Sequence, residues 1–389
     1  MFTRGTSQKP GQERGSLTFR RLDRYAGIPL IATLGLFRSA REKPSTIKRV
    51  GLLKTAGIGD TILLSAIVND LRRAIPDAHL VLFTGAENHA AGLLLDSLDA
   101  VVKLPLKNPV ALRERLRQYR FDAFLDFGPW PRINALIAAM AHAQYTIGFR
   151  TAGQYRHYAY DLAVSHSDQQ HELENYRGIV RALGIKTSSP PALRSPLIPV
   201  GTLPFSSSDT RYSVFHLWPG GFRSNLREWP AERWVTLAQS FRREAISIVL
   251  TGAPADREKN EVVRDEMRRQ GVEDVHNVAG CSLAETAAIV AAASIVVSVN
   301  TGVMHIAAAL GIPVVGVHGP TNSRRWGPVG PRAASVNAPL EGCGYLNLGF
   351  EYQDALDCMG CISVDQVWLA CAPLLQECST ASDASSAWT

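Results

Sequence analysis

The feature that most constrains the fold is a repeated alternation of short β-branched runs with longer stretches of helical periodicity. In the first half, runs such as RVGLLKT (49–55) and FDAFLDF (121–127) are separated by helical stretches, one of them over roughly 60–75. The alternation begins again at RYSVFHLWPG (211–220) and continues to IPVVGVHGP (312–320). Such βαβα alternation is typical of a parallel sheet covered by helices on both faces. We therefore expect an α/β fold with two doubly wound, Rossmann-like domains.

The stretch 150–210 interrupts this rhythm, and its last part is rich in Pro and Ser, which marks a linker. A helix near 364–377 is a candidate for packing back across the domain boundary. Because ligands of open α/β sheets bind at the carboxyl ends of the strands, we expect the active site in the cleft between the two domains. The predicted segments are a basic N-terminal arm with a short apolar segment (1–47), a first domain (48–185), a linker (186–210), a second domain (211–363) and a C-terminal helix and tail (364–389).

The 389-residue chain has a formal net charge of +6, and the positive charge lies at its start. Residues 1–50 hold 11 Lys/Arg and 3 Asp/Glu, which gives +8, whereas the other 339 residues hold 30 and 32, which gives −2. This pattern leaves three alternatives for the arm: a tail followed by one packed helix, association of residues 20–43 with an anionic membrane surface, or nucleic-acid binding, which is least favoured. The basic residues around the apolar stretch 27–37 are Arg20, Arg21, Arg24, Arg38, Arg41 and Lys43.

No run approaches the roughly 18 consecutive apolar residues of a membrane span, and no small-residue cleavage site follows 27–37. We expect a cytoplasmic protein, peripheral on the inner face of the cytoplasmic membrane if the arm binds lipid. Five of the six cysteines lie in the last 47 residues, and in a reducing compartment a disulfide framework is not expected. CMGC (358–361) has zinc-knuckle spacing but lacks a second pair, so unligated, packed thiols are favoured over zinc.

The stretch KTAGIGDTILLSA (54–66) joins the first strand to the first helix through a turn that ends in a carboxylate. Gly57 and Gly59 begin a dinucleotide-binding motif, but Ile62 stands where its third glycine belongs, and no Gly-Lys-Ser/Thr follows as in a phosphate loop. Asp60 falls at the start of the helix. It is either a capping residue or a base facing the cleft, held ionised by the positive end of the helix.

Two loops of the second half carry groups suited to an anion. The stretch HLWPGGFRSNLREWPAERW (216–234) places Arg223 and Arg227 between a strand and a helix. These arginines either face an anionic ligand at the mouth of the cleft or are merely solvated.

The other loop is in the stretch 298–328, where Asn300, Thr301 and Gly302 open an alanine-rich helix. Its free amides favour an anion, and the missing side chain of Gly302 lets a phosphate approach the backbone. The next strand leads to Gly319 and Thr321 on the same rim, so the two loops together predict a diphosphate site. His305, one turn into the helix, is open to a structural or a functional interpretation.

Taken together, three motifs resemble glycosyltransferase family 9, the lipopolysaccharide heptosyltransferases and their relatives, over about residues 48–370. The motifs are KTAGIGDTILLSAIVNDLRRAIPDAHL, PGG…REWPAERW and NTGVMHIAAALGIPVVGVHGPTN…RWGP. The resemblance implies a GT-B fold, with two Rossmann-like domains facing a central cleft. It also implies an inverting transfer of a sugar, typically heptose from ADP-L-glycero-β-D-manno-heptose, to lipopolysaccharide core or a related lipid-linked glycan.

The resemblance also implies roles for individual residues. The general base falls on Asp60 and a donor-phosphate contact on Arg227. The diphosphate loop falls on Thr301, Gly302 and His305. Lys54 matches a basic residue that opens the first loop and is assigned to the donor, and Glu258 matches, more weakly, an acidic residue near the ribose.

Two residues depart from the family pattern: Asn300 replaces a frequent Asp, and Val303 a frequent Pro, so the identity of the sugar stays open. No Asp-x-Asp occurs in the chain, and we predict metal independence with no cofactor besides the nucleotide-sugar donor. An epimerase-like GT-B enzyme and an inactive nucleotide-sugar-binding relative are the alternatives. Candidate acceptor-side residues are Gly59, His89, Trp130, Arg132, Asn134 and Arg150.

Overall fold

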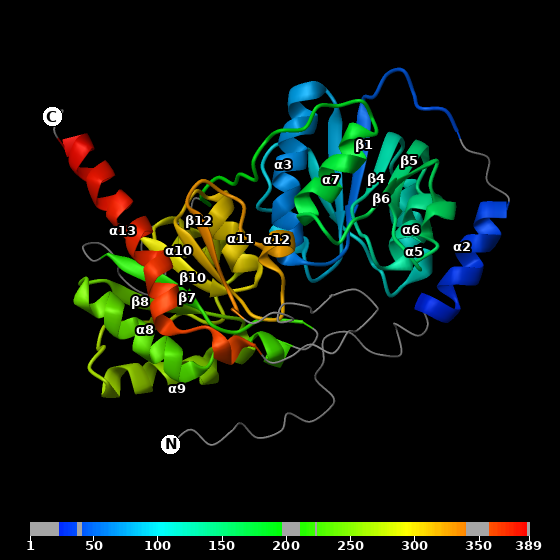
Figure 1. Ribbon diagram of the computed structural model, residues 1–389. Coiled ribbons are helices and arrows are strands. Elements are labelled where there is room, and N and C mark those ends of the chain that lie inside the picture. Colours follow the sequence, from blue (N-terminus) through cyan, green and yellow to red (C-terminus); the bar gives the residue numbers. More distant parts are fainter. Residues whose placement is uncertain (1–22, 37–40, 197–210, 222–223, 340–357, 387–389) are drawn as a thin grey trace.

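The computed structural model describes residues 23–36, 41–196, 211–221, 224–339 and 358–386, with the backbone alone for 377–386. Two domains, each built on one parallel six-stranded sheet, lie side by side (Figure 1). Arg223 and the basic residues Arg20, Arg21 and Arg38 lie outside the described residues. None of the helices in the described part is long and apolar enough to cross a membrane.

The first sheet has the strand order β3-β2-β1-β4-β5-β6, so the order reverses between β1 and β4. Its strands are β1 (Arg49–Lys54), β2 (His79–Thr84), β3 (Ala100–Lys103), β4 (Phe121–Asp126), β5 (Ala143–Arg150) and β6 (Leu162–Ser165). Its helices are α3 (Ile58–Ala74), α4 (His89–Gly92), α5 (Pro109–Arg117), α6 (Arg132–Met140) and α7 (Glu172–Arg181), with the 3₁₀ turn η1 (Arg156–Ala159).

The second sheet has the order β12-β11-β10-β7-β8-β9, the same topology with its reversal between β7 and β10. Its strands are β7 (Tyr212–His216), β8 (Ser247–Thr251), β9 (Val275–Asn277), β10 (Ile295–Val299), β11 (Val314–His318) and β12 (Ala333–Asn337). Its helices are α8 (Ala231–Arg243), α9 (Arg257–Arg269), α10 (Leu283–Ala291), α11 (Gly302–Ala309), α12 (Ser323–Trp326) and α13 (Val364–Ser386), with the 3₁₀ turns η2 (Ser224–Arg227), η3 (Pro254–Asp256) and η4 (Met359–Cys361).

The expected parallel sheets are confirmed, and each has one more strand than the patterns predicted. The additional strands, β6 and β12, lie at sheet edges and have half-exposed side chains, so they lack the apolar run of a central strand. The sequence pattern favours a helix over 87–97, whereas α4 is only a single turn.

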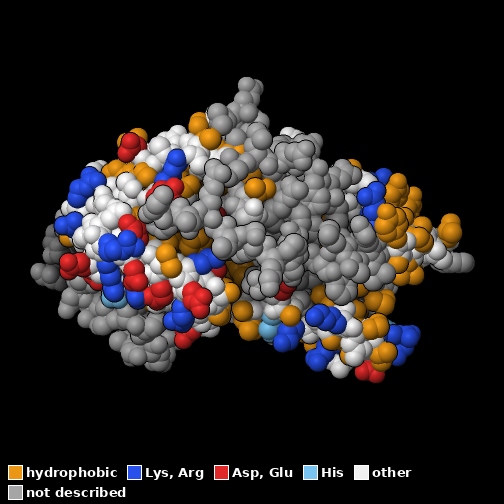
Figure 2. Space-filling view, turned by 90° about the horizontal axis from the view of Figure 1, so that it is seen from below, with side chains coloured by type: hydrophobic (Ala, Val, Ile, Leu, Met, Phe, Trp, Pro, Cys, Tyr) orange, Lys and Arg blue, Asp and Glu red, His pale blue; other side chains and the backbone are white. Residues whose placement is uncertain are grey.

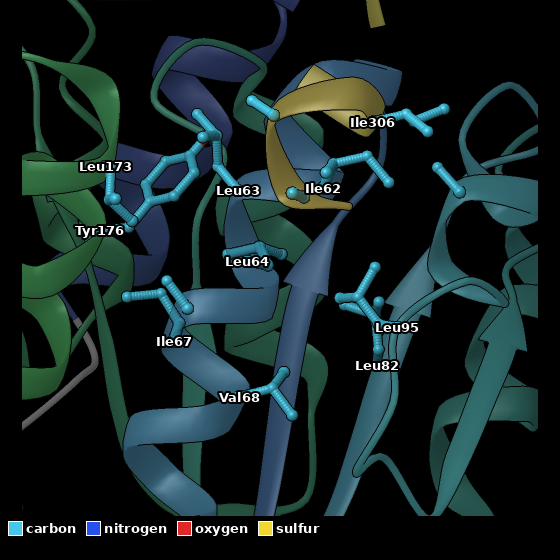
Figure 3. Packing of buried hydrophobic residues seen from close by; sticks show 14 of the residues in the cluster. Ile62, Leu63, Leu64, Ile67, Val68, Leu82, Leu95, Leu173, Tyr176 and Ile306 are labelled. Atoms are coloured by element: carbon cyan, nitrogen blue, oxygen red, sulfur yellow. The ribbon is translucent and has the colours of Figure 1, made fainter. Parts of the chain in front are cut away.

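Helices α3 and α11 pack directly against each other across the domain boundary. Ile62 of α3 and Ile306 of α11 belong to one hydrophobic core that continues from the first domain into the second (Figure 3). The segment after α7 joins the same contact: the backbone amide of Leu193 donates to the carbonyl oxygen of Ala309, and that of Ala192 to Oγ of Ser65. At the amino ends of the two helices, which carry two of the predicted loops, a Cβ on Gly302 would lie 2.5 Å from Cγ2 of Ile58, so these ends lie against each other.

The C-terminal segment differs from expectation in two respects. Helix α13 packs on α8 and beside β11 of the second domain, where Val367 and Cys371 are fully buried, and so it does not return to the first domain. Cys358 is disulfide-bonded, so the expectation of unpaired thiols is wrong at this position. That expectation rested on the inferred compartment and not on geometry. Cys281, Cys361 and Cys371 are free.

Candidate active site

The first turn of α3 presents Asp60 at the carboxyl end of β1, next to the reversal in strand order. The turn depends on Gly57, whose φ of 85° lies in the left-handed region that favours glycine. Asn88 stabilises the turn with two hydrogen bonds: its Nδ2 donates to the carbonyl oxygen of Lys54 and to Oγ1 of Thr61, each at 2.8 Å. Gly57 is the N-cap residue and no side chain caps the helix, so the simple capping interpretation of Asp60 is wrong.

The carboxylate of Asp60 is paired with Lys54, which the sequence analysis had assigned to the donor side. Nζ of Lys54 lies 2.9 Å from Oδ2 of Asp60, 2.7 Å from the hydroxyl of Tyr176 and 3.3 Å from the carbonyl oxygen of Phe127. These three contacts use all the donors of an ammonium group. The Lys54 side chain is 4% exposed and that of Asp60 is 32% exposed, so the lysine is a buried support and the carboxylate is reachable from solvent.

Tyr176 of α7 is the residue at this site that the sequence analysis missed. Burial, together with the nearby charges of Asp60 and Glu172, raises its pKa well above the usual value of a phenol, so the hydroxyl stays protonated. No short motif marks it, because it comes from a helix more than 100 positions along the chain. Only the packing of α7 against α3 brings it to Lys54.

The second domain supplies the opposite wall through the loop between β10 and α11. Asn300 is buried, and its backbone carbonyl oxygen accepts a hydrogen bond from Nη1 of Arg227 at 3.3 Å. Nη2 of Arg227 donates to the backbone carbonyl oxygen of Gly220 at 2.6 Å. Burial lowers the pKa of Arg227 to about 10, partly offset by Glu228, which leaves the guanidinium charged at neutral pH. Oγ1 of Thr301 lies 3.1 Å from Oγ of Ser298. Arg227, Asn300 and Thr301 therefore come together, as predicted.

His305 brings the second domain into contact with the loop of Asp60. A Cβ atom on Gly59 would lie less than 3.0 Å from Cδ2 of the His305 ring. Burial lowers the pKa of His305 to about 4, with His171 adding to the effect and Asp60 opposing it, so the imidazole is neutral. Behind it, His318 at the end of β11 is fully buried, and burial and His305 lower its pKa to about 3.

The rim after β11 carries Gly319 and Thr321. Gly319 lies against Met359, since an added Cβ would stand 2.5 Å from its Sδ. Oγ1 of Thr321 is buried without a hydrogen-bond partner in the described part of the chain. A hydroxyl in that state is available to a ligand oxygen.

Two further contacts cross the boundary beside the candidate site. Nδ1 of His171 accepts from the backbone of Leu173, so Nε2 carries the proton and donates to the carbonyl oxygen of Gly327 at 3.0 Å. The guanidinium of Arg325 lies 3.6 Å from the carboxylate of Glu172 and 5.6 Å from the ring centre of Trp130.

Glu172 is ionised at this boundary. Burial alone would raise its pKa, but the hydrogen bond from His166 and the charges of His166, Arg325 and Lys54 lower it to about 2. The side chain is therefore charged at neutral pH and attracts Arg325 across the domain boundary.

The remaining predicted residues lie elsewhere or serve the fold. Glu258 is exposed in the first turn of α9. Arg132 is buried and binds Asp23 at 2.9 Å, with its Nε donating to the carbonyl oxygen of Gln154. Arg150 is exposed at the end of β5. Among the described residues, no group of three His, Cys, Asp or Glu side chains could hold a metal ion.

The chain matches a known protein family. The profile of glycosyltransferase family 9 (heptosyltransferase) matches residues 110–345. The chain is 27% identical over 328 residues to lipopolysaccharide heptosyltransferase 1 of Escherichia coli K12, covering 77% of this chain and 96% of that protein.

Two solved structures share the fold. They are E. coli heptosyltransferase WaaC with ADP (TM-score 0.68, 22% identity, 84% of this chain and 99% of that one) and the glycosyl transferase family 9 protein of Veillonella parvula (TM-score 0.69, 19% identity, 85% and 98%). The fold is therefore GT-B, as expected.

Proposed function

Because the chain belongs to glycosyltransferase family 9, we propose that it transfers heptose from ADP-heptose, with inversion, to a hydroxyl group of a lipopolysaccharide core or related lipid-linked glycan. The relative named as lipopolysaccharide heptosyltransferase 1 and the WaaC structure with ADP support the donor and the acceptor class. The observation that carries the mechanism is the partly exposed Asp60 carboxylate, which lies where the amino ends of α3 and α11 meet.

Asp60 acts as the general base. Its carboxylate takes the proton of the acceptor hydroxyl while that oxygen attacks the anomeric carbon and the bond to the diphosphate breaks. Lys54 is a positioning residue: it holds Oδ2 of Asp60 at 2.9 Å and leaves the other carboxylate oxygen, Oδ1, for the acceptor. The single carboxylate suits a one-step displacement, which inverts the anomeric configuration.

The leaving diphosphate requires positive stabilisation, which the second domain supplies. Arg227 stays charged. The first backbone amides of α11 have no partner within the helix, and the positive end of the helix dipole lies at the same loop. The hydroxyls of Thr301 and Thr321 add hydrogen-bond donors on this rim. These groups can neutralise the departing charge without a bridging cation, and we propose metal-independent transfer.

The test is ADP release with and without lipid acceptor, for the wild type and for Asp60→Asn, which keeps the size of the side chain. Loss of a general base lowers turnover by about 10²–10⁴-fold, whereas the rise in thermal stability on adding ADP should persist, since the donor loops are unchanged. Full turnover in the variant would remove Asp60 from the mechanism. Turnover that chelator abolishes and divalent cation restores would contradict metal independence.

A further inference from the structure

Helix α2 (Gly27–Leu36) lies at the outer end of the first domain, on the side away from the second domain (Figure 1). It packs against α6 and η1, with Ile31 fully buried. The ion pair between Asp23 and Arg132 ties its start to α6. Near its end, a Cβ on Gly35 would stand 2.7 Å from Cβ of Tyr158. The helix is therefore held in one orientation.

The solvent-facing side of α2 is apolar, the reverse of the usual surface helix. Leu36 is 83% exposed and Leu30 is 50% exposed. Within α2, the one exposed polar side chain is Thr33, and its hydroxyl donates to the carbonyl oxygen of Pro29 at 2.8 Å. The exposed residues from 25 to 36 are Tyr25, Ala26, Pro29, Leu30, Thr33, Leu34 and Leu36.

Two tyrosines of the adjoining turn widen this face. Tyr155 is 48% exposed and Tyr158 45% exposed, and Tyr158 lies directly against α2. Figure 2 shows hydrophobic side chains gathered at this end of the molecule, with basic side chains close by. We call α2 together with Tyr155 and Tyr158 the α2 face.

The charges around the α2 face are mainly positive. Arg24 is exposed just before α2. Helix α6, which packs against α2, ends at Met140. Met140 lines a cavity of about 530 Å³ together with Arg49, Arg120 and Arg41, the last of which is ion-paired with Asp161 at 2.9 Å. The acidic residue of that cavity is Asp122, whose carboxylate accepts from the backbone amides of Lys48 and Arg49.

We propose that the α2 face docks on the surface of an anionic lipid bilayer. Leucine side chains enter the boundary between headgroups and acyl chains, tyrosines suit the headgroup level, and the cationic rim attracts anionic lipid. A second copy of the chain is a poorer occupant, because a two-fold contact through the same face would bring the two cationic rims together. Docking at the outer end of the first domain leaves the contact between α3 and α11 clear of the membrane.

The experiment is cosedimentation of the full chain with phosphatidylcholine vesicles and with vesicles of equal phosphatidylcholine and phosphatidylglycerol. The test variant is Leu30→Ser/Leu34→Ser/Leu36→Ser. The matched control is Leu93→Ser/Val262→Ser/Leu369→Ser, which removes three apolar side chains of comparable exposure elsewhere. We expect binding to the anionic vesicles that weakens with salt, a loss of at least tenfold in the test variant, and less than twofold change in the control.

Two results would overturn the proposal: no binding of the wild type to anionic vesicles, or equal binding by the two triple variants. A concentration-dependent dimer that the test variant abolishes, without vesicle binding, would also count against it and assign the face to a second copy. ADP-induced thermal stabilisation checks that the test variant is folded, and the single variant Leu36→Ser, at the most exposed position, should show a smaller loss of the same sign. Vesicle binding is read without turnover, so its failure is distinct from failure of the proposed transfer.

Discussion

Replacing Gly59 by alanine tests whether the close approach of α3 and α11 belongs to the working enzyme. In an ordinary helix interior the change would stabilise the protein, since alanine is better than glycine by about 1 kcal/mol. Here the new methyl group would stand less than 3.0 Å from the buried His305 ring, closer than carbon atoms can approach. Overpacking of this kind costs about 1–3 kcal/mol. The net expectation is a loss of up to about 2 kcal/mol in the free energy of unfolding.

The test is whether Gly59→Ala lowers or raises the free energy of unfolding, which urea unfolding measures. Gly360→Ala is the matched control, because a Cβ there meets nothing within 4 Å. His305→Ala should remove the obstacle, so the double variant should show that the cost of Gly59→Ala largely disappears. Turnover should fall with stability in Gly59→Ala, since Asp60 is the next residue. A Gly59→Ala variant that is more stable than the wild type and fully active would show that the two helices do not lie this close in the working enzyme.

The remaining predictions concern the second domain. Arg227→Gln should weaken ADP binding by about 10–100-fold, as expected for losing a charge-assisted contact of about 1.5–3 kcal/mol. Isothermal calorimetry on the variant and the wild type measures this change in affinity. An unchanged affinity would mean that the diphosphate binds elsewhere. His318 has a folded-state pKa of about 3, below its unfolded value, so the unfolded chain binds more protons and stability is lost as pH falls below about 6.5. At about pH 5 the free energy of unfolding is lower by about 2 kcal/mol than at neutral pH. In urea unfolding, His318→Asn should reduce this acid-induced loss of stability by about the same amount. An equal loss in the variant and the wild type would contradict the low pKa of His318.

The central strands and the two loops could be predicted from sequence because their signals are local. β1, β10 and β11 are mostly apolar and almost entirely buried, and each is followed by small residues that open a turn. Asp60 and Thr301 follow directly from those turns. The loop residues of each domain were therefore predictable without knowing how the domains meet.

The partners of these residues could not be predicted, because they come from distant elements. Tyr176 reaches Lys54 from α7, and Glu172 meets Arg325 from the other domain. Lys54 itself was assigned to the donor by resemblance, whereas its three hydrogen bonds stay within the first domain. A side chain's type and position along a strand do not specify which buried group will use its donors.

The glycines of the two loops, Gly59 and Gly302, allow the two domains to come close together as much as they leave space for ligands. From the sequence alone, the absent side chain of Gly302 suggests space for a phosphate. In the structure a Cβ there would lie 2.5 Å from Cγ2 of Ile58 and 3.2 Å from the backbone nitrogen of Gly59. Gly59 in turn makes room for His305. Each helix thus begins with a residue that lets the opposite helix come close, and Asp60, one position beyond Gly59, is carried to the boundary by that approach. The proposed base and the proposed donor loops can form one site only while the two helix ends touch, so substitutions at these glycines should impair transfer more than they impair the folding of either domain.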